Sequence, residues 1–203
     1  MTLTLYTNPM SRGRIARWML EEVGQPYETV WLDYDGSMRM GEYLRVNPMG
    51  KVPALRHGEG IVTEAAAICA YLADAFPEAG LGPREGERAD YWRWLFFAAG
   101  PVEQALTNHA MGFDPSPEQG RMAGYGSYDA TVATLAGAVA DGFVAGERFT
   151  AADVYVGSGI GWGLRLGTLP DRPAFRAYWD RVKDREARLR AEAIDDAKMA
   201  EGA

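Results

Sequence analysis

Strand-like segments are confined to the first third of this 203-residue chain, and this restriction limits the folds that it can adopt. Residues 2–7 alternate apolar and β-branched side chains, residues 27–33 read as a second strand, and short apolar runs lie at 52–55 and 60–63. Such runs are typical of short strands. Beyond residue 87 no segment has comparable strand character. The pattern predicts a small α/β half followed by an all-helical half.

Helical periodicity fills the segments between and after these strands. Apolar residues recur at helical spacing from Ile15 to Val23, and Gly24 is suited to end that helix. Another helix is predicted within EAAAICAYLADAF, residues 64–76, after the hairpin-like turn RHGEG. Together these elements predict the order βαβ followed by ββα. Further helices are expected over residues 86–111, 118–141, 151–166 and 173–190.

A segment rich in Pro, Gly and charge, PEAGLGPREGE at residues 77–87, is typical of a linker. We therefore expect an N-terminal domain over residues 1–78, a linker over 79–86 and an all-helical C-terminal domain over 87–203. The last segment, AEAIDDAKMAEGA, is expected to form a frayed, solvated helix.

Charge and composition exclude several classes of function. The net charge of -7 and the presence of only three lysines argue against a nucleic-acid partner, because such binding relies on clustered Lys and Arg. No apolar stretch reaches the ~20 residues that span a bilayer, so we expect no membrane partner and a cytoplasmic location. Cys69 is the only cysteine, and His57 and His109 lie far apart, so neither a disulfide nor a metal site is expected.

Several polar residues have a structural interpretation from the sequence alone. Thr150 to Asp153 form a capping box of the S/T-x-x-D type, and Phe149 with Val154 would complete a hydrophobic staple. Thr63 is suited to be the N-cap of the helix that follows it. Arg12 and Arg17 are taken as solvated, and the peptide bond before Pro53 would by base rates be trans.

Three motifs point to a known family. They are NPMGKVPAL at residues 47–55, TEAAAICAYL at 63–72 and RFTAADV at 148–154. In this order and spacing, the whole chain resembles the cytosolic glutathione transferases. The resemblance implies a thioredoxin-like N-terminal domain, an all-α C-terminal domain, glutathione as co-substrate and a homodimer.

The resemblance also implies the glutathione-binding residues. Pro53 matches a cis-proline, which turns the backbone of Val52 outward to pair with the cysteinyl part of glutathione. Glu64 matches the residue that binds the glutathione amino group. Ala65 replaces the family's usual serine, so its N–H alone would hold the γ-glutamyl carboxylate, at a loss of ~1.5–3 kcal/mol. Lys51 matches a residue near the glycyl carboxylate, although a solvated loop lysine is an equally good interpretation.

Ser11, in the turn YTNPMSRGR at residues 6–14, resembles the serine of theta- and zeta-like transferases. A serine hydroxyl is too weak an acid to serve as a base, so its catalytic role would be to donate a hydrogen bond to the glutathione thiolate. The alternative is a plain helix N-cap, a role that Asn8 could share. Arg14 would either add positive potential or pair with an acid at the domain interface. Weaker candidates for the electrophile pocket are Met10, Trp94 and Phe97.

These features predict a transferase in which the glutathione thiolate attacks a small hydrophobic electrophile. The absence of cysteine from residues 6–14 excludes the cysteine-type members of the family. Two alternatives stay open. One is a non-catalytic binding or regulatory module, favoured by Ala65, and the other is a glutathione-dependent disulfide reductase.

Overall fold

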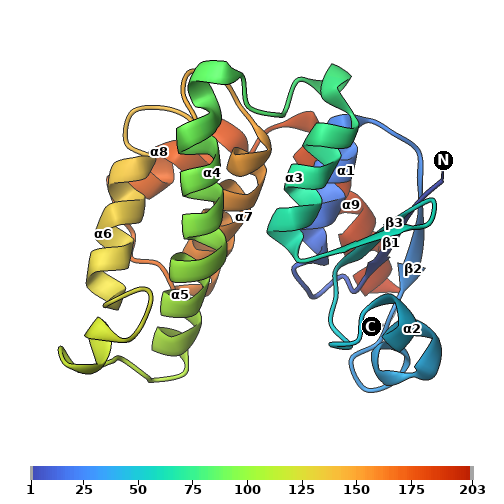
Figure 1. The fold of residues 1–203 in the computed structure, drawn as a ribbon, viewed down its shortest axis with the longest axis horizontal. Helices are drawn as coiled ribbons and strands as arrows, with labels where there is room; N and C mark the ends of the chain where they lie inside the picture. Colours follow the sequence, from blue (N-terminus) through green and yellow to red (C-terminus); the bar gives the residue numbers. More distant parts are fainter. Residues whose placement is uncertain (1, 202–203) are drawn as a thin grey trace. The chain divides into compact units, whose positions relative to one another are not determined.

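The computed structural model describes residues 2–201, and its contacts divide the chain into two compact units. The first unit contains the residues up to Gly82 together with those from Arg185 onward, and the second unit is Pro83–Asp184. Figure 1 shows the elements of each unit. No helix within residues 2–201 has the length and apolar character needed to cross a membrane.

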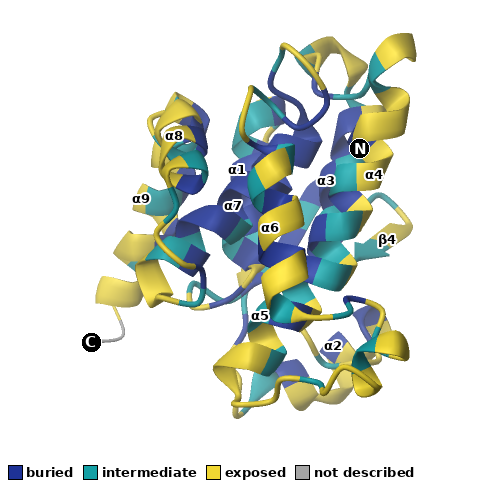
Figure 2. Ribbon diagram, turned by 90° about the vertical axis from the view of Figure 1, so that its left-hand side faces the viewer, coloured by how far each residue is buried: buried dark blue, intermediate teal, exposed yellow. Residues whose placement is uncertain are grey.

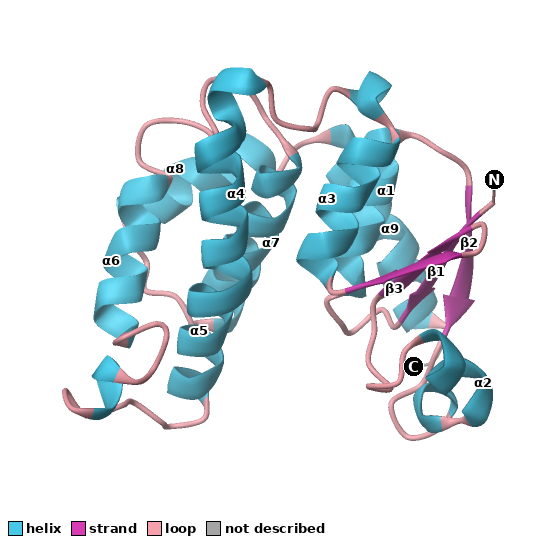
Figure 3. Cartoon of the chain, in the orientation of Figure 1, coloured by secondary structure: helices cyan, strands magenta, loops and turns pink. Residues whose placement is uncertain are grey.

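The first unit is built on a four-stranded sheet with the order β2-β1-β3-β4 (Figure 3). Strand β1 (Leu3–Thr7) pairs in parallel with β2 (Tyr27–Trp31), while β3 (Ala54–His57) pairs antiparallel with both β1 and β4 (Gly60–Thr63). Leu3 and Leu5 are buried because alternate residues of β1 face the core. The four predicted strands are confirmed, as is the thioredoxin-like arrangement that the sequence motifs imply.

Helices α1 (Gly13–Val23) and α3 (Ala65–Ala75) pack against each other and against the sheet (Figure 3). Their buried apolar faces include Met19, Ile68 and Leu72. Gly24 ends α1 as predicted, with a left-handed φ of 67° and an N–H that donates to the Leu20 carbonyl. Between β2 and β3 the chain forms a 3-10 turn (Ser37–Arg39) and the short helix α2 (Gly41–Val46).

The last helix, α9 (Glu186–Ala200), packs on α1 and belongs to the first unit. One expectation therefore needs correction, because residues from Arg185 onward cluster with the first unit and not with the helical one. Residues 191–200 of the last segment are helical and mostly exposed, but Ala191 and Asp195 are buried, and residues 202–203 lie outside the described residues. The physical reason is a set of buried residues on α9, including Ala191 and Asp195, that face α1. The ion pair of Arg185 with Glu22 adds to this contact at 2.6 Å.

The second unit is entirely helical apart from turns and an isolated bridge. Its principal helices are α4 (Arg88–Phe97), α5 (Glu103–Ala110), α6 (Tyr128–Ala138), α7 (Ala151–Leu166) and α8 (Pro173–Val182). A π-helical turn (Ala98–Val102) joins α4 to α5. Two predicted helices are shorter than expected: most of 118–127 is a loop with one 3-10 turn (Gln119–Arg121), and 173–190 is interrupted between α8 and α9.

Helix α7 is the buried centre of this unit, as its dark blue ribbon in Figure 2 shows. Its glycines permit close packing: a Cβ added to Gly161 would lie 2.5 Å from the Trp179 ring, and one added to Gly163 would lie 2.6 Å from Leu169. The predicted capping box is confirmed, because the Asp153 carboxylate accepts from the N–H and the hydroxyl of Thr150. Burial raises the pKa of Asp153, although the surrounding donors oppose this effect.

Candidate functional site

The register of the sheet brings three separate segments to one edge of the first unit. Tyr6 pairs with Ala54, and Ala54 pairs with Thr63. The end of β1, the beginning of β3 and the end of β4 therefore lie side by side. The Ser11 turn follows β1, Val52 and Pro53 precede β3, and Glu64 follows β4. The predicted site residues thus come from neighbouring positions on a single sheet edge.

Ser11 lies buried in the turn between β1 and α1, with 6% of its surface exposed. Its Oγ donates to the Asn8 carbonyl at 2.7 Å and accepts from the Gly13 N–H at 2.9 Å. The hydroxyl therefore satisfies the first N–H of α1, so the N-terminal capping contact is real although the formal N-cap is Arg12. Gly13 is required here, because a Cβ would lie 1.8 Å from the Thr7 hydroxyl oxygen.

Side-chain hydrogen bonds to the Lys51 carbonyl fix the segment that precedes β3. The Lys51 carbonyl accepts from the Tyr43 hydroxyl at 2.5 Å and from Nδ2 of Asn47 at 2.7 Å. The side chain of Val52 packs against the cluster that contains Tyr43. Burial raises the pKa of Tyr43 to about 12, so this phenol stays a hydrogen-bond donor at neutral pH.

The backbone of Val52 is available to a ligand. The Val52–Pro53 peptide bond is cis. Within residues 2–201 neither the N–H nor the C=O of Val52 makes a hydrogen bond. The Lys51 side chain is exposed and forms no ion pair with any described residue. Together these groups present one donor, one acceptor and one exposed positive charge.

The start of α3 differs from the expectation in one respect. Thr63 is not the N-cap, because it still belongs to β4 and pairs with Ala54. Glu64 occupies that position with φ 66° and ψ 120°, and among the described residues it is the only non-glycine residue with positive φ. Such a conformation is costly and is found most often where function requires it. The Glu64 carboxylate is exposed and has no partner within residues 2–201.

Ala65 is buried, at 7% exposure, and supplies no hydroxyl to the first turn of α3. The first intrahelical bond runs from the Ile68 N–H to the Glu64 carbonyl, so the N–H groups of Ala65, Ala66 and Ala67 have no acceptor in the described chain. Three aligned N–H groups at a helix start favour an anion. They can hold a carboxylate without a side-chain donor.

The two arginines of α1 have fixed partners. Arg14 donates from Nε to the Pro9 carbonyl and forms an ion pair with Asp196, both at 2.6 Å, so the pairing interpretation of Arg14 holds. Its acid lies on α9, within the same unit, and not at the interface of the two units as expected. Arg17 was expected to be solvated, and this is wrong: it is 1% exposed and its Nε lies 3.0 Å from Asp195.

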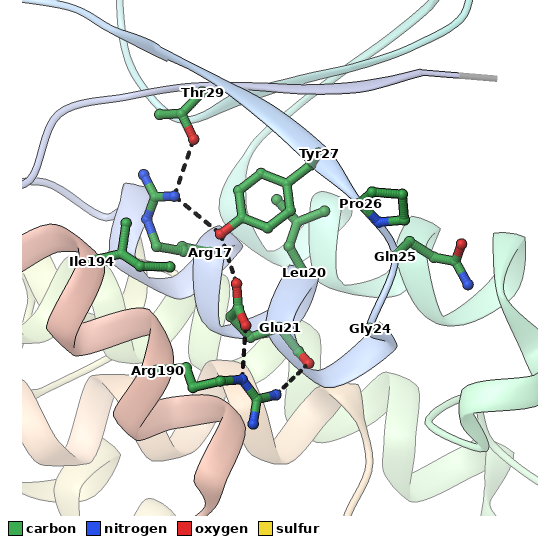
Figure 4. A pocket seen from close by; sticks show the side chains of 10 residues that line it. All are labelled: Arg17, Leu20, Glu21, Gly24, Gln25, Pro26, Tyr27, Thr29, Arg190 and Ile194. Atoms are coloured by element: carbon green, nitrogen blue, oxygen red, sulfur yellow. Dashed lines mark hydrogen bonds and ion pairs between the residues drawn. The ribbon is translucent and has the colours of Figure 1, made fainter.

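Arg17 also forms the inner wall of a pocket of about 680 Å³ on the first unit (Figure 4). Its Nη1 donates to the hydroxyls of Tyr27 and Thr29, each at 3.1 Å. Tyr27 in turn donates to Glu21, and Glu21 pairs with Arg190. The bonds drawn in Figure 4 connect Arg17, Tyr27 and Glu21 to Arg190 of α9, and we assign this cluster to the docking of α9.

Other residues with possible chemistry are occupied or buried. Burial raises the pKa of the Cys69 thiol well above its usual range, which keeps it protonated. Nδ1 of His57 is 2.9 Å from the Tyr71 hydroxyl, and His109 pairs with Asp114. Within residues 2–201 no three His, Cys, Asp or Glu side chains are grouped to hold a metal ion.

The weaker pocket candidates lie in different units. Met10 is 64% exposed on the Ser11 turn of the first unit. Trp94 and Phe97 lie on α4 of the second unit, with ring centroids 5.6 Å apart in an edge-to-face arrangement. Their roles stay predictions.

Three residues that shape the site were not predicted from the sequence: Asn47, Tyr43 and Tyr34. Asn47 and Tyr43 both bind the Lys51 carbonyl, and the signal for Asn47 is the tripeptide Asn-Pro-Met, which also occurs at residues 8–10. Tyr34, whose hydroxyl donates to the Met10 carbonyl at 3.1 Å, had no recognisable signal.

A thioredoxin-like unit with a cis-proline at one edge of its sheet, combined with a helical unit, is the architecture of a glutathione-dependent transferase. Residues 1–74 match the family described as "Glutathione S-transferase, N-terminal domain". A glutathione S-transferase of Xanthomonas campestris is 29% identical in an alignment that covers 95% of this chain and 100% of that protein.

Solved structures agree with this assignment. A glutathione transferase from Methylococcus capsulatus has a TM-score of 0.77 and 29% identity, covering 96% of this chain and 99% of that one. A sphingomonad glutathione S-transferase complexed with glutathione has a TM-score of 0.75 and 29% identity, with coverages of 95% and 98%. Residues 1–74 therefore belong to the glutathione S-transferase N-terminal domain family, and glutathione S-transferases match the chain over nearly its full length.

Proposed function

We propose that this protein binds glutathione along the sheet edge described above and stabilises its thiolate for attack on a small hydrophobic electrophile. The observation that carries the proposal is the position of the Ser11 hydroxyl at the start of α1, on the same edge as the open backbone of Val52. Glu64 would bind the glutathione amino group, Lys51 would lie near the glycyl carboxylate, and the first turn of α3 at Ala65 would hold the γ-glutamyl carboxylate.

Ser11 would act through its proton. In the structure Oγ–H points to the Asn8 carbonyl, and rotation about the Cβ–Oγ bond would redirect it to sulfur while the Gly13 N–H bond is kept. Lowering a thiol pKa from ~8.5 by two units requires ~2.7 kcal/mol. One charge-assisted hydrogen bond and the α1 dipole can supply this together. The thiolate then forms the new C–S bond, and the electrophile's leaving group departs with the bonding electron pair.

Replacement of Ser11 tests this mechanism. In Ser11→Ala, kcat for conjugation of a model aryl halide should fall by ~10–100-fold, because the thiolate loses a charge-assisted bond worth ~1.5–3 kcal/mol. The glutathione dissociation constant should change by less than about twofold, since Val52 and Glu64 are untouched. Steady-state kinetics and calorimetry measure the two quantities. Ser37→Ala is the matched control, because Ser37 accepts a similar backbone bond from Asp33 in an outer turn. Unchanged turnover in Ser11→Ala would remove Ser11 from the mechanism.

Replacement of Ala65 is predicted to increase the affinity for glutathione. Ala65→Ser should lower the glutathione dissociation constant by roughly 10–100-fold, because the hydroxyl adds one hydrogen bond to a carboxylate. Ala67→Ser, on the exposed side of the same turn, should change it by less than about twofold. Calorimetric titration measures both. Equal affinities in all three proteins would place the γ-glutamyl carboxylate elsewhere.

A non-catalytic binding or regulatory module is the second candidate, and Ala65 is the observation that favours it. It differs from the transferase in one measurable way: no heat should be released when wild-type protein is titrated with millimolar glutathione. Turnover of a mixed disulfide in place of an aryl halide would instead identify a glutathione-dependent reductase. The homodimer stays a prediction from the family resemblance, and the cytoplasmic location stays a prediction from the lack of a membrane-spanning apolar stretch in the sequence.

A further inference from the structure

The tripeptide Asn-Pro-Met occurs twice in the chain, at residues 8–10 and 47–49, once on each side of the proposed site. The two copies fold in the same way. In each, Oδ1 of the asparagine accepts from the methionine N–H two residues later, at 2.9 Å for Asn8 and 3.1 Å for Asn47. This contact is an Asx turn, in which a side chain replaces a backbone carbonyl.

The other end of each asparagine amide ties its turn to a second segment. Nδ2 of Asn8 donates to the Leu32 carbonyl at 2.8 Å, just beyond β2. Nδ2 of Asn47 donates to the Lys51 carbonyl at 2.7 Å, just before Val52. In each asparagine, Oδ1 therefore shapes the turn, and Nδ2 anchors the turn to another part of the chain.

The first turn fixes the Ser11 hydroxyl. The Asn8 carbonyl accepts from both the N–H and the Oγ of Ser11, at 3.1 and 2.7 Å. A shift of Asn8 would consequently move the Ser11 backbone and the acceptor that holds its hydroxyl. The Leu32 contact prevents such a shift, because it fastens Asn8 to the segment that follows β2.

The second turn fixes the peptide-binding segment. Asn47 is 4% exposed, and its carbonyl also accepts from the Gly50 N–H at 2.9 Å. The Lys51 carbonyl belongs to the peptide unit that carries the Val52 N–H. Asn47 therefore orients that N–H through the Lys51 carbonyl, and among the described residues it makes no hydrogen bond with Ser11.

We propose that the two Asn-Pro-Met turns are paired positioning elements with separate effects, one on thiol reactivity and one on glutathione affinity. Asn8 sets the position of the Ser11 hydroxyl and so controls the reactivity of the thiol, while Asn47 sets the Val52 backbone and so controls the affinity for glutathione. The inference rests on the proposed function. Neither asparagine needs to contact glutathione, because each acts through a neighbour.

Two alanine variants separate these roles, and each is the control for the other. Asn8→Ala should raise the pKa of the bound glutathione thiol by ~1 unit and lower kcat about tenfold, with KM for glutathione within about twofold of wild type. Asn47→Ala should raise KM for glutathione about tenfold and leave the pKa of the bound thiol unchanged. The thiol pKa is read from thiolate absorbance against pH, and KM and kcat come from aryl halide kinetics.

Serine variants guard against loss of folding. Asn8→Ser and Asn47→Ser keep an oxygen that can accept the methionine N–H, but they cannot reach the distant carbonyl. They should fold as wild type by circular dichroism and show the same split between thiol pKa and KM. If the variants at both asparagines instead lower kcat and raise KM together, the two turns support the whole site without separate roles, and the inference is wrong.

A Ser11→Ala background distinguishes this inference from the proposed function. If Ser11→Ala raises the thiol pKa and adding Asn8→Ala raises it no further, Asn8 acts through Ser11 as proposed. A second, additive rise overturns the inference but leaves the function of Ser11 intact. No change in thiol pKa on Ser11→Ala alone would overturn the proposed function itself.

Discussion

An Arg17→Met variant is expected to lose about 3–5 kcal/mol of unfolding free energy, because it leaves the Asp195 carboxylate buried without its cation. Arg17 and Asp195 are 1% and 0% exposed, and their contact joins α1 to α9. Arg17 also lies over the Trp31 ring at 4.7 Å, so its loss removes a cation–π contact as well. Denaturant titration of the full chain measures the change.

The pH dependence of this loss has a definite sign. Burial raises the pKa of Asp195, and Arg17 opposes that rise. Without Arg17 the folded-state pKa should rise further above the unfolded value, so protonation favours the folded variant. The deficit should therefore be largest at neutral pH and should shrink as the pH falls through the folded pKa of Asp195.

Two further variants isolate the effect of leaving the Asp195 carboxylate buried without a cation. The pair is joined by one hydrogen bond only, because Nη2 of Arg17 and Oδ2 of Asp195 have no partner within residues 2–201. Arg17→Met with Asp195→Leu should consequently recover most of the lost stability. Arg190→Ala breaks the more exposed pair with Glu21 and should cost less than about 1 kcal/mol. Equal losses in Arg17→Met and Arg190→Ala would contradict a special role for burial.

Asp153→Ala should be similarly destabilising, at about 3–5 kcal/mol, because the carboxylate serves several buried donors at once. Besides the two bonds from Thr150, it accepts from the Val144 N–H at 2.8 Å and from the Tyr178 hydroxyl at 2.7 Å. Alanine would leave these donors without an acceptor at the start of α7 and between α7 and α8. Chemical denaturation again provides the measurement.

Asp129→Ala is the matched control for Asp153→Ala. Asp129 also lies in the first turn of a helix, but it is exposed, so its main effect on stability is through the helix dipole. Its removal should cost less than about 1 kcal/mol. Because Asp153 is structural, Asp153→Asn, which keeps the size and one acceptor, should retain normal thiol pKa values for bound glutathione. A changed thiol pKa would show that Asp153 takes part in the chemistry.

Features set by neighbouring residues could be predicted from the sequence. The capping box at Thr150 and the end of α1 at Gly24 depend on contacts within a few positions, so their residue types are sufficient evidence. The strands follow from their apolar runs, and their register then places the predicted site segments on one edge.

Features set by distant partners could not be predicted. Arg17 was predicted to be a surface cation because its partner, Asp195, is 178 positions away in the sequence. No local sequence pattern indicates such a distant contact. The same holds for α9, whose sequence reads as a polar helix until α1 is placed beside it. Thr63 was mistaken for an N-cap because Ser and Thr favour that position, whereas the positive φ of Glu64 goes against side-chain preference.

The membership of α9 in the first unit also sets an order of events during synthesis. Residues up to Gly82 leave the ribosome first, but the partner of Arg17 follows only after all of Pro83–Asp184 has been made. At ~5–20 residues per second this delay lasts on the order of 5–20 s. During that time the nascent sheet and its two covering helices carry a cation without its buried carboxylate. The unit that starts first is therefore finished last, and its final assembly step takes place after the helical unit has been translated.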